Sequence, residues 1–277
     1  MEANTPELIR KSQWLRKELF DLVVKKQKGH IPSSYSINEM LIALYYGGYV
    51  QSPAGPKDPN RDRVIISKGH AAMALYPILI DKGYVPGSET AKFTDADGML
   101  RMYADPSIPG IESVTGSLGH GVGIACGYAL AAKCDGAKYS TYVIAGDGEC
   151  YEGSIWETAL FAAHHKLNNF CLIVDRNGLC IMDATENCVK MDPLDEKFRS
   201  FGFDVRKIDG HRYSQILPAL NDFEARKSDR PMAIIMDTVK GKGISFMEGK
   251  AGWHNKMMSP QETEKALAEL NQNPIKD

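Results

Sequence analysis

The stretch that decides the fold is residues 141–183, TYVIAGDGECYEGSIWETALFAAHHKLNNFCLIVDRNGLCIMD. An apolar run from Tyr142 to Ala145 predicts a buried strand, and apolar residues at helical spacing predict a helix from Ile155 to Lys166. A second apolar run, Phe170 to Val174, predicts another strand. Strand, helix and strand of these lengths form a βαβ unit, so the two strands should be parallel.

Polar residues follow both predicted strands. Asp147 stands in Gly146-Asp147-Gly148-Glu149, and Asn177 lies 30 residues later in front of Gly178. Open α/β sheets bind ligands outside the carboxyl ends of parallel strands, where both residues should lie. Carboxylate, amide and backbone carbonyl oxygens suit Mg²⁺, which usually completes its octahedron with phosphate oxygens and water. The spacing therefore predicts a metal-bridged diphosphate at this edge of the sheet.

The motif GDGECYEG at 146–153, followed by VDRNG at 174–178, resembles the cofactor-binding half of transketolase. The resemblance implies an α/β fold, with a doubly wound, mostly parallel sheet and helices on both faces. It implies thiamine diphosphate and Mg²⁺ as cofactors, with Asp147, Asn177 and the backbone carbonyl of Leu179 as metal ligands. Gly148, Glu149 and Asn177 are implied to contact the cofactor.

Other segments extend the resemblance over nearly the whole chain. They are Gly29-His30, DRVIISKGHAAMALY at 62–76, the glycine-rich loop 110–121, and TVKGKGISFME at 238–248. By resemblance, His30 faces the substrate, His70 contacts the diphosphate, and His254 serves both as a catalytic and as a cofactor-binding residue. Gly116, Ser117 and Leu118 are implied to lie against the cofactor rings. From the residues alone, His30 could instead interact with the dipole of the preceding helix.

Two positions depart from the family pattern. Transketolases usually carry a sugar-contacting histidine in a Gly-His-Pro just upstream of the position of Pro109-Gly110, whereas this chain has Met102 and Tyr103 there. The family commonly has glutamine where this chain has His120. The missing histidine puts the standard sugar substrate in doubt.

Composition indicates a globular protein without a nucleic-acid or membrane partner. Of the 277 residues, 43% are apolar and 25% are charged, and the formal net charge is −2. No apolar run approaches the roughly 20 residues of a spanning helix, and no signal peptide is recognisable. The six cysteines show no CxxC pair, so we expect reduced thiols in a cytoplasmic protein.

We expect a single domain over 1–277. Its first helix is predicted at about 5–28, with Thr5 as the capping-type residue, and a C-terminal loop and helix at about 238–277. A polar loop is expected at 30–34. Residues 63–70 are expected to run from a short strand into a turn. Further strands are expected at 203–208 and 231–237, and further helices at 36–46, 71–82, 122–133, 192–201, 213–225 and 260–271.

The resemblance covers only the N-terminal domain of transketolase, so the sequence predicts one subunit of a split enzyme. Such an enzyme transfers a two-carbon ketol unit from a ketose, a sugar phosphate or a modified sugar, to an aldose. The partner is expected to be a C-terminal subunit with the pyrimidine-binding domain, which supplies a glutamate to the cofactor ring, in an α₂β₂ heterotetramer active only when assembled. The alternatives are a two-component thiamine enzyme that acts on a 2-oxo acid, and a non-catalytic nucleotide-binding domain.

Overall fold

Five parallel strands form one sheet at the centre of the computed structural model, which describes residues 4–181 and 183–272. The strand order is β1-β2-β3-β5-β4. The register sets Thr141 beside Phe170 and Gly146 beside Asp175, so the polar residues after β2 and β3 emerge at the same edge. The strands are β1 (Arg63–Ile66), β2 (Thr141–Gly146), β3 (Phe170–Arg176), β4 (Asp204–Asp209) and β5 (Met232–Asp237).

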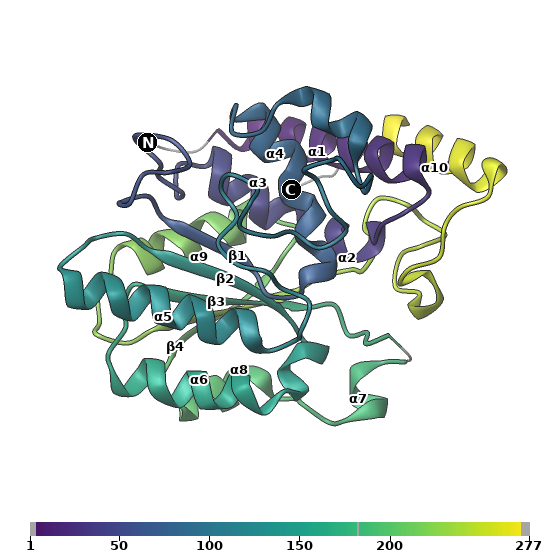
Figure 1. Ribbon diagram of the computed structural model, residues 1–277. Helices are drawn as coiled ribbons and strands as arrows, with labels where there is room; N and C mark the ends of the chain where they lie inside the picture. The colour runs from purple at the N-terminus through teal and green to yellow at the C-terminus, as the bar shows by residue number, and fades with distance from the viewer. Residues whose placement is uncertain (1–3, 182, 273–277) are drawn as a thin grey trace.

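Alternate side chains of each strand enter two separate cores, one on each face of the sheet. In β2, Tyr142 and Ile144 join one core, whereas Val143 and Ala145 join the other. Helices cover both faces (Figure 1), which confirms the predicted doubly wound α/β fold. The first core includes residues of α1 (Thr5–Lys26), α3 (Asn38–Tyr46), α4 (Leu75–Asp81), α9 (Tyr213–Glu224) and α10 (Pro260–Gln272), and the second those of α5 (His120–Asp135), α6 (Gly153–His164) and α8 (Leu194–Ser200).

The N-terminal region differs from its prediction in three places. Thr5 is the first residue of helix α1, and Asn4, not Thr5, occupies the N-cap position, without a side-chain hydrogen bond. The helix ends at Lys26, because the backbone of Gln27 is in the left-handed conformation with φ 51°. The predicted polar loop 30–34 is wrong. It forms the buried helix α2 (Ile31–Tyr35), in which Ser34 Oγ donates to the carbonyl of His30 at 3.0 Å and the carbonyl of Ser33 accepts from Lys68 Nζ at 2.8 Å.

The helix predicted at 36–46 begins at Asn38, and the one predicted at 71–82 divides into a 3₁₀ turn, η1 (Gly69–Ala74), and α4. The remaining helices begin and end within about two residues of the positions predicted for them. Of the predicted C-terminal segment, residues 273–277 lie outside the described part. None of the described helices is long and apolar enough to cross a membrane. Besides α2, the elements not predicted within the described residues are η2 (Gly87–Lys92), η3 (Gly148–Tyr151), α7 (Thr185–Cys188) and η4 (Ala251–Trp253).

Four neighbouring strands deliver polar residues to one edge of the sheet. The segments that follow β1, β2, β3 and β5 begin with Ser67, Asp147, Asn177 and Thr238. Gly69 lets two of the loops at this edge meet, because a Cβ on it would lie 2.2 Å from the carbonyl oxygen of Thr115. The parallel sheet thus gathers segments that are far apart in the sequence around one position.

Candidate active site

A cavity of about 490 Å³ opens at this edge of the sheet. Its size suits a cofactor-sized ligand. All the predicted site residues except Ser117 line it: His30, His70, Gly116, Leu118, Asp147, Gly148, Glu149, Asn177, Leu179 and His254. The structure therefore brings together residues that span more than 220 positions of the chain, whereas their individual roles stay predictions.

Asp147 is, with Glu149, one of two buried carboxylates that line the cavity. Its Oδ1 accepts a hydrogen bond from the amide of Gly148 at 2.8 Å, and its Oδ2 accepts one from the amide of Gly178 at 2.6 Å. Gly178 adopts the left-handed conformation this close approach requires, with φ 76°. Burial, followed by the charge of Asp175, raises the pKa of Asp147 to about 6. A buried carboxylate with a raised pKa favours a bound cation, which would lower that pKa again.

Asn177 is oriented by a buried ion pair, Lys68–Asp175, that was not predicted. Asp175 Oδ2 accepts from Lys68 Nζ at 2.6 Å and from Asn177 Nδ2 at 2.9 Å. Since a carboxylate only accepts, the amide nitrogen of Asn177 must face it, and Asn177 Oδ1 is directed away. Burial is the largest single influence on the pKa of Asp175 and would raise it, but the charge and hydrogen bond of Lys68, together with the hydrogen bonds from Thr238 and Ser36, hold that pKa below its usual value.

Lys68 could have been found from the SKGH motif, which places a lysine two residues before the predicted His70. Its ammonium also donates to the carbonyl of Ser33 at 2.8 Å, so it ties α2 to the end of β3. This pair is buried on both sides, with side-chain exposures of 3% and 0%. It forms the floor of the predicted metal site.

Glu149 lines the cavity, but protein donors already occupy its carboxylate. Its Oε1 accepts from the amide of Gly119 at 2.8 Å and from the hydroxyl of Ser67, and its Oε2 accepts from the amide of Gly146 at 3.1 Å. These bonds join the ends of β1 and β2 to the loop before α5. The carboxylate therefore holds the cavity wall in place.

Three histidines from distant segments meet above this floor. The ring centroids of His30 and His70 are 5.5 Å apart, those of His30 and His254 are 5.4 Å apart, and those of His70 and His254 are 5.0 Å apart. Lys240 lies beside them, with its Nζ 3.0 Å from His254 Nδ1. The ammonium can only donate, so His254 Nδ1 accepts.

Burial is the largest cause that lowers the pKa of each of these histidines. The pKa of His70 falls to about 2 and that of His254 to about 4, with Lys68 and Lys240 respectively as the next causes. The pKa of His30 is also lowered, by burial and then by Lys240. At neutral pH the three imidazoles are neutral, so each can donate at one nitrogen and accept at the other.

We predict that His30 and His70 have different roles, one toward the substrate and the other toward the cofactor. In the assembled enzyme, His30→Ala should lower kcat by roughly 10- to 100-fold with little change in cofactor affinity, because we expect His30 to contact substrate rather than cofactor. His70→Ala should instead weaken cofactor binding by roughly tenfold. Steady-state kinetics and isothermal titration measure both effects, with the exposed His164→Ala as control. Loss of cofactor affinity in His30→Ala with normal turnover at saturation would reverse the assignment.

Lys240 supplies the positive charge that the neutral histidines lack. Only 3% of it is exposed, and burial and the charge of Lys68 lower its pKa to about 8. An anionic diphosphate favours the charged form of the Lys240 amine. Above about pH 8 the free protein holds this amine mostly uncharged, so Lys240 must take up a proton when the cofactor binds. Cofactor affinity should therefore fall as pH rises through 8, by up to about tenfold per unit.

The Lys240→Met variant tests this dependence, because it should bind more weakly at pH 7 and lose the slope above pH 8. Titrations from pH 6.5 to 9.5 measure it. Lys242→Met is the matched control from the same loop, since Lys242 pairs with Glu248 at 3.6 Å in a different cavity. An unchanged slope in the Lys240→Met variant would rule out this lysine as the titrating group.

The lining fits a cofactor with a diphosphate and a metal ion. His30 Nδ1 and Ser33 Oγ are buried in the cavity wall, and neither has a hydrogen-bond partner within 4–181 and 183–272. Buried polar atoms normally have partners, so these two atoms point to a ligand. Over the same residues, no group of three His, Cys, Asp or Glu side chains could hold a metal, so a cation here needs amide, carbonyl and phosphate oxygens as well.

The loop before α5 contributes only part of what was predicted. Gly116 and Leu118 line the cavity, whereas Ser117 does not, and its hydroxyl lies 3.1 Å from His120 Nδ1. His120 is exposed and also lies outside the lining. Tyr103 lines the cavity instead, with its ring 3.3 Å from the position of a Cβ on Gly116. An aromatic ring thus occupies the segment in which the family histidine is missing.

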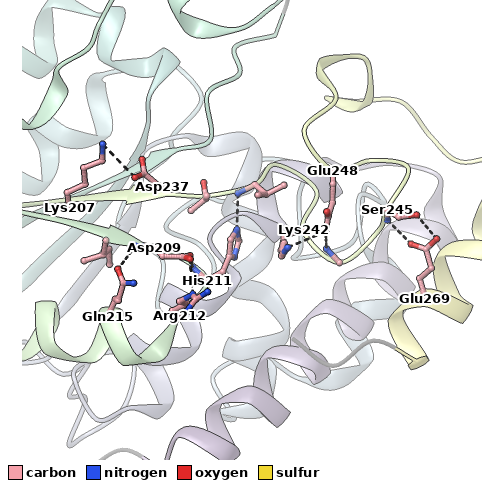
Figure 2. A pocket seen from close by; sticks show the side chains of 14 residues that line it. Lys207, Asp209, His211, Arg212, Gln215, Asp237, Lys242, Ser245, Glu248 and Glu269 are labelled. Carbon is pink, nitrogen blue, oxygen red and sulfur yellow. Dashed lines mark hydrogen bonds and ion pairs between the residues drawn. The ribbon is translucent and has the colours of Figure 1, made fainter. Parts of the chain in front are cut away.

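A second and larger cavity, of about 920 Å³, lies at the carboxyl ends of β4 and β5 (Figure 2). Its charged side chains largely pair with one another, as Lys207 does with Asp237 at 3.7 Å and Arg212 with Asp209 at 3.1 Å. His211 is held by the backbone amide of Val239 at 2.9 Å and by Glu39 at 2.8 Å. We therefore place the chemistry in the smaller cavity.

Comparisons with known proteins agree with this geometry. Residues 10–277 match the family model described as the thiamine diphosphate binding domain of transketolase. The chain is 37% identical over 272 residues to one subunit of the apulose-4-phosphate transketolase of Phocaeicola vulgatus, covering 98% of this chain and 96% of that one. It is 38% identical over 271 residues to the 6-deoxy-6-sulfo-D-fructose transketolase subunit SqwG of a Clostridium species, covering 98% of both.

Solved structures give the same result. The crystal structure of the transketolase from Campylobacter jejuni superposes with a TM-score of 0.88 at 31% identity, over 97% of this chain and 43% of that one. The chain thus spans less than half of that enzyme but nearly all of the two subunits. The chain belongs to the transketolase family and corresponds to its thiamine diphosphate-binding domain.

Proposed function

We propose that this chain is the diphosphate-binding subunit of a two-component transketolase that transfers a two-carbon ketol unit from a ketose to an aldose. The observation that carries the proposal is the meeting of Asp147, Asn177 and the three histidines around one cavity. When bound, thiamine diphosphate supplies the carbon nucleophile and the electron sink that ketol transfer needs.

The residues of this chain would divide the remaining tasks. Asp147, Asn177 and the carbonyl of Leu179 would hold Mg²⁺, with the Lys68–Asp175 pair keeping the Asn177 amide in orientation. His70, His254 and Lys240 would face the diphosphate. His30, neutral and with a buried Nδ1, would exchange protons or hydrogen bonds with the substrate hydroxyls.

The substrate we propose is a modified or phosphorylated ketose. The names of two relatives give apulose-4-phosphate and 6-deoxy-6-sulfo-D-fructose, both ketoses that differ from common sugar phosphates. Tyr103, a bulky ring in the cavity wall, supports a donor site of a different shape. The relatives favour ketol transfer over the alternatives of a 2-oxo acid donor and of a non-catalytic domain.

We also propose a partner polypeptide that carries the pyrimidine-binding domain, in an α₂β₂ assembly. The relatives from Phocaeicola vulgatus and Actinobacillus succinogenes are each named as one subunit of a transketolase, which implies that a second one exists in those enzymes. Apolar side chains at the mouth of the cavity support a covering surface, since Tyr103 is 44%, Ile181 65% and Val189 53% exposed.

Isotope tracing tests the reaction. The complex of this chain with its partner should move carbons 1 and 2 of a ¹³C-labelled ketose into a longer sugar when an aldose is added. Labelled pyruvate should give no product under the same conditions. Transfer from pyruvate, with no transfer from any ketose, would contradict the proposed function.

A further inference from the structure

Two cysteines meet at the mouth of the cofactor cavity. The Sγ atoms of Cys180 and Cys188 are 3.2 Å apart, and both residues line the cavity. A disulfide bond is about 2.05 Å long, so the sulfurs need to approach by only about 1.2 Å to bond. The four other cysteines differ from this pair: Cys126, Cys150 and Cys171 are buried, and Cys134 is exposed on α5.

Backbone hydrogen bonds join residues 178–180 to residues 183–185, close to the two thiols. The amide of Cys180 donates to the carbonyl of Asp183 at 3.0 Å, and the amide of Thr185 donates to the carbonyl of Gly178 at 3.0 Å. Leu179 and Ala184 form an antiparallel bridge, and Cys188 is the last residue of α7. This backbone pairing keeps the two side chains on the same side of the turn.

In the chain without its partner subunit, the pair is accessible to small reagents from outside. Cys188 is exposed and Cys180 is half-buried. Each stands next to an exposed apolar residue: Ile181 is 65% and Val189 53% exposed. A low-molecular-weight disulfide can therefore reach Cys188 first and leave Cys180 as the second thiol.

The pair is also joined to the predicted metal loop. Cys180 follows Leu179 directly, and a Cβ on Gly148 would lie 3.3 Å from the Cβ of Cys180. Tyr151 contacts the segment that carries Cys188, since its hydroxyl donates to the carbonyl of Thr185, the first residue of α7, at 2.6 Å. A ligand in the cavity therefore lies against both thiols.

We propose that Cys180 and Cys188 form a dithiol site that low-molecular-weight disulfides, such as oxidised glutathione, convert to an intramolecular disulfide. The Cys188 thiolate attacks one glutathione sulfur, the glutathione S–S bond breaks, and one glutathione leaves as a thiol. Cys180 then attacks the mixed disulfide at Cys188 and releases the second glutathione. The two protein thiols lose two electrons and two protons in all, and the glutathione disulfide gains them as two thiols.

Peptide mass spectrometry tests the proposal on the full chain. Trypsin cleavage after Arg176 and Lys190 releases one peptide, 177–190, that holds both cysteines, whereas Cys134 falls in 134–138. The chain is incubated with oxidised glutathione, alkylated with iodoacetamide and digested. We expect peptide 177–190 to be two hydrogens lighter and not alkylated, and Cys134 to carry only glutathione or the alkyl group.

The Cys180→Ser variant separates intramolecular closure from simple glutathione addition. It should accumulate the glutathione adduct of Cys188 to a level at least about tenfold above that in the unmodified chain, where Cys180 resolves the adduct. Thiamine diphosphate with Mg²⁺, added to the complex, should slow closure. Equal adduct levels in the Cys180→Ser variant and the unmodified chain, or oxidation at Cys134 alone, would overturn the proposal.

Discussion

Replacing Asp147 with alanine should reduce Mg²⁺-dependent binding of thiamine diphosphate by the assembled enzyme at least about 100-fold. The variant loses the one buried carboxylate that we assign to the metal, and it also loses the acceptor of the Gly178 amide at 2.6 Å. The loop that carries Asn177 and Leu179 then loses this side-chain hydrogen bond to the segment after β2. Asn177→Ala should cost less, roughly tenfold, because an amide ligand is neutral and Asp147 remains.

Isothermal titration with Mg²⁺ and cofactor measures both effects. Asp229→Ala is the matched control, since Asp229 pairs with Lys166 on the surface, where 60% of its side chain is exposed. Thermal melts followed by circular dichroism establish that each variant folds. Undiminished cofactor affinity in a folded Asp147→Ala enzyme would remove Asp147 from the metal site.

The same carboxylate should make metal binding depend on pH. With its pKa raised to about 6, Asp147 holds a proton in the metal-free protein below that pH, and Mg²⁺ must displace it. Affinity for Mg²⁺ should therefore be steady above pH 6 and fall by up to about tenfold per unit below it. In the Asp147→Ala variant, any remaining affinity for Mg²⁺ should not fall below pH 6 in this way.

The local pattern of the chain was sufficient to predict the central strands of the sheet and the tight turns at their carboxyl ends. The apolar runs before Asp147 and Asn177 form β2 and β3, and they are paired in parallel as the βαβ unit requires. The glycines beside Asp147 and Asn177 indicated the tight turns at the strand ends. These features depend on residues close in sequence, which is why they could be predicted.

Long-range partners account for what could not be predicted. Residues 31–35 are serine-rich and resembled a loop, but they are buried in α2 because Ser33 and Ser36 contact Lys68 and Asp175, which are far away in the chain. The Lys68–Asp175 pair joins positions 107 residues apart. Such a contact cannot be predicted from the periodicity or spacing of residues along the chain.

The contacts among the cysteines and among the histidines could not be predicted from local sequence patterns either. His30, His70 and His254 could be assigned to one site only through the family resemblance, because nothing in their spacing brings them together. Cys180 and Cys188 are eight residues apart in a turn that the sequence did not indicate. Their contact depends on the pairing of Leu179 with Ala184 and on the short helix α7.

The second large effect concerns the partner. The chain by itself should show turnover lower than that of the assembled enzyme by about 100- to 10,000-fold, the range that loss of a positioned acid–base group costs. The transketolase resemblance assigns the glutamate that activates the cofactor ring to the pyrimidine-binding domain, and this chain spans only 43% of the transketolase from Campylobacter jejuni. We propose that the residues of this chain supply the metal and diphosphate side of the site.

A coupled ketol-transfer assay, with the partner polypeptide titrated into a fixed amount of this chain, tests the two-component account most directly. The rate should be at background without the partner, rise in proportion to added partner, and saturate at one partner per chain. The Asp147→Ala chain should stay at background throughout. Robust turnover by the 277-residue chain, purified free of any partner, would contradict the account.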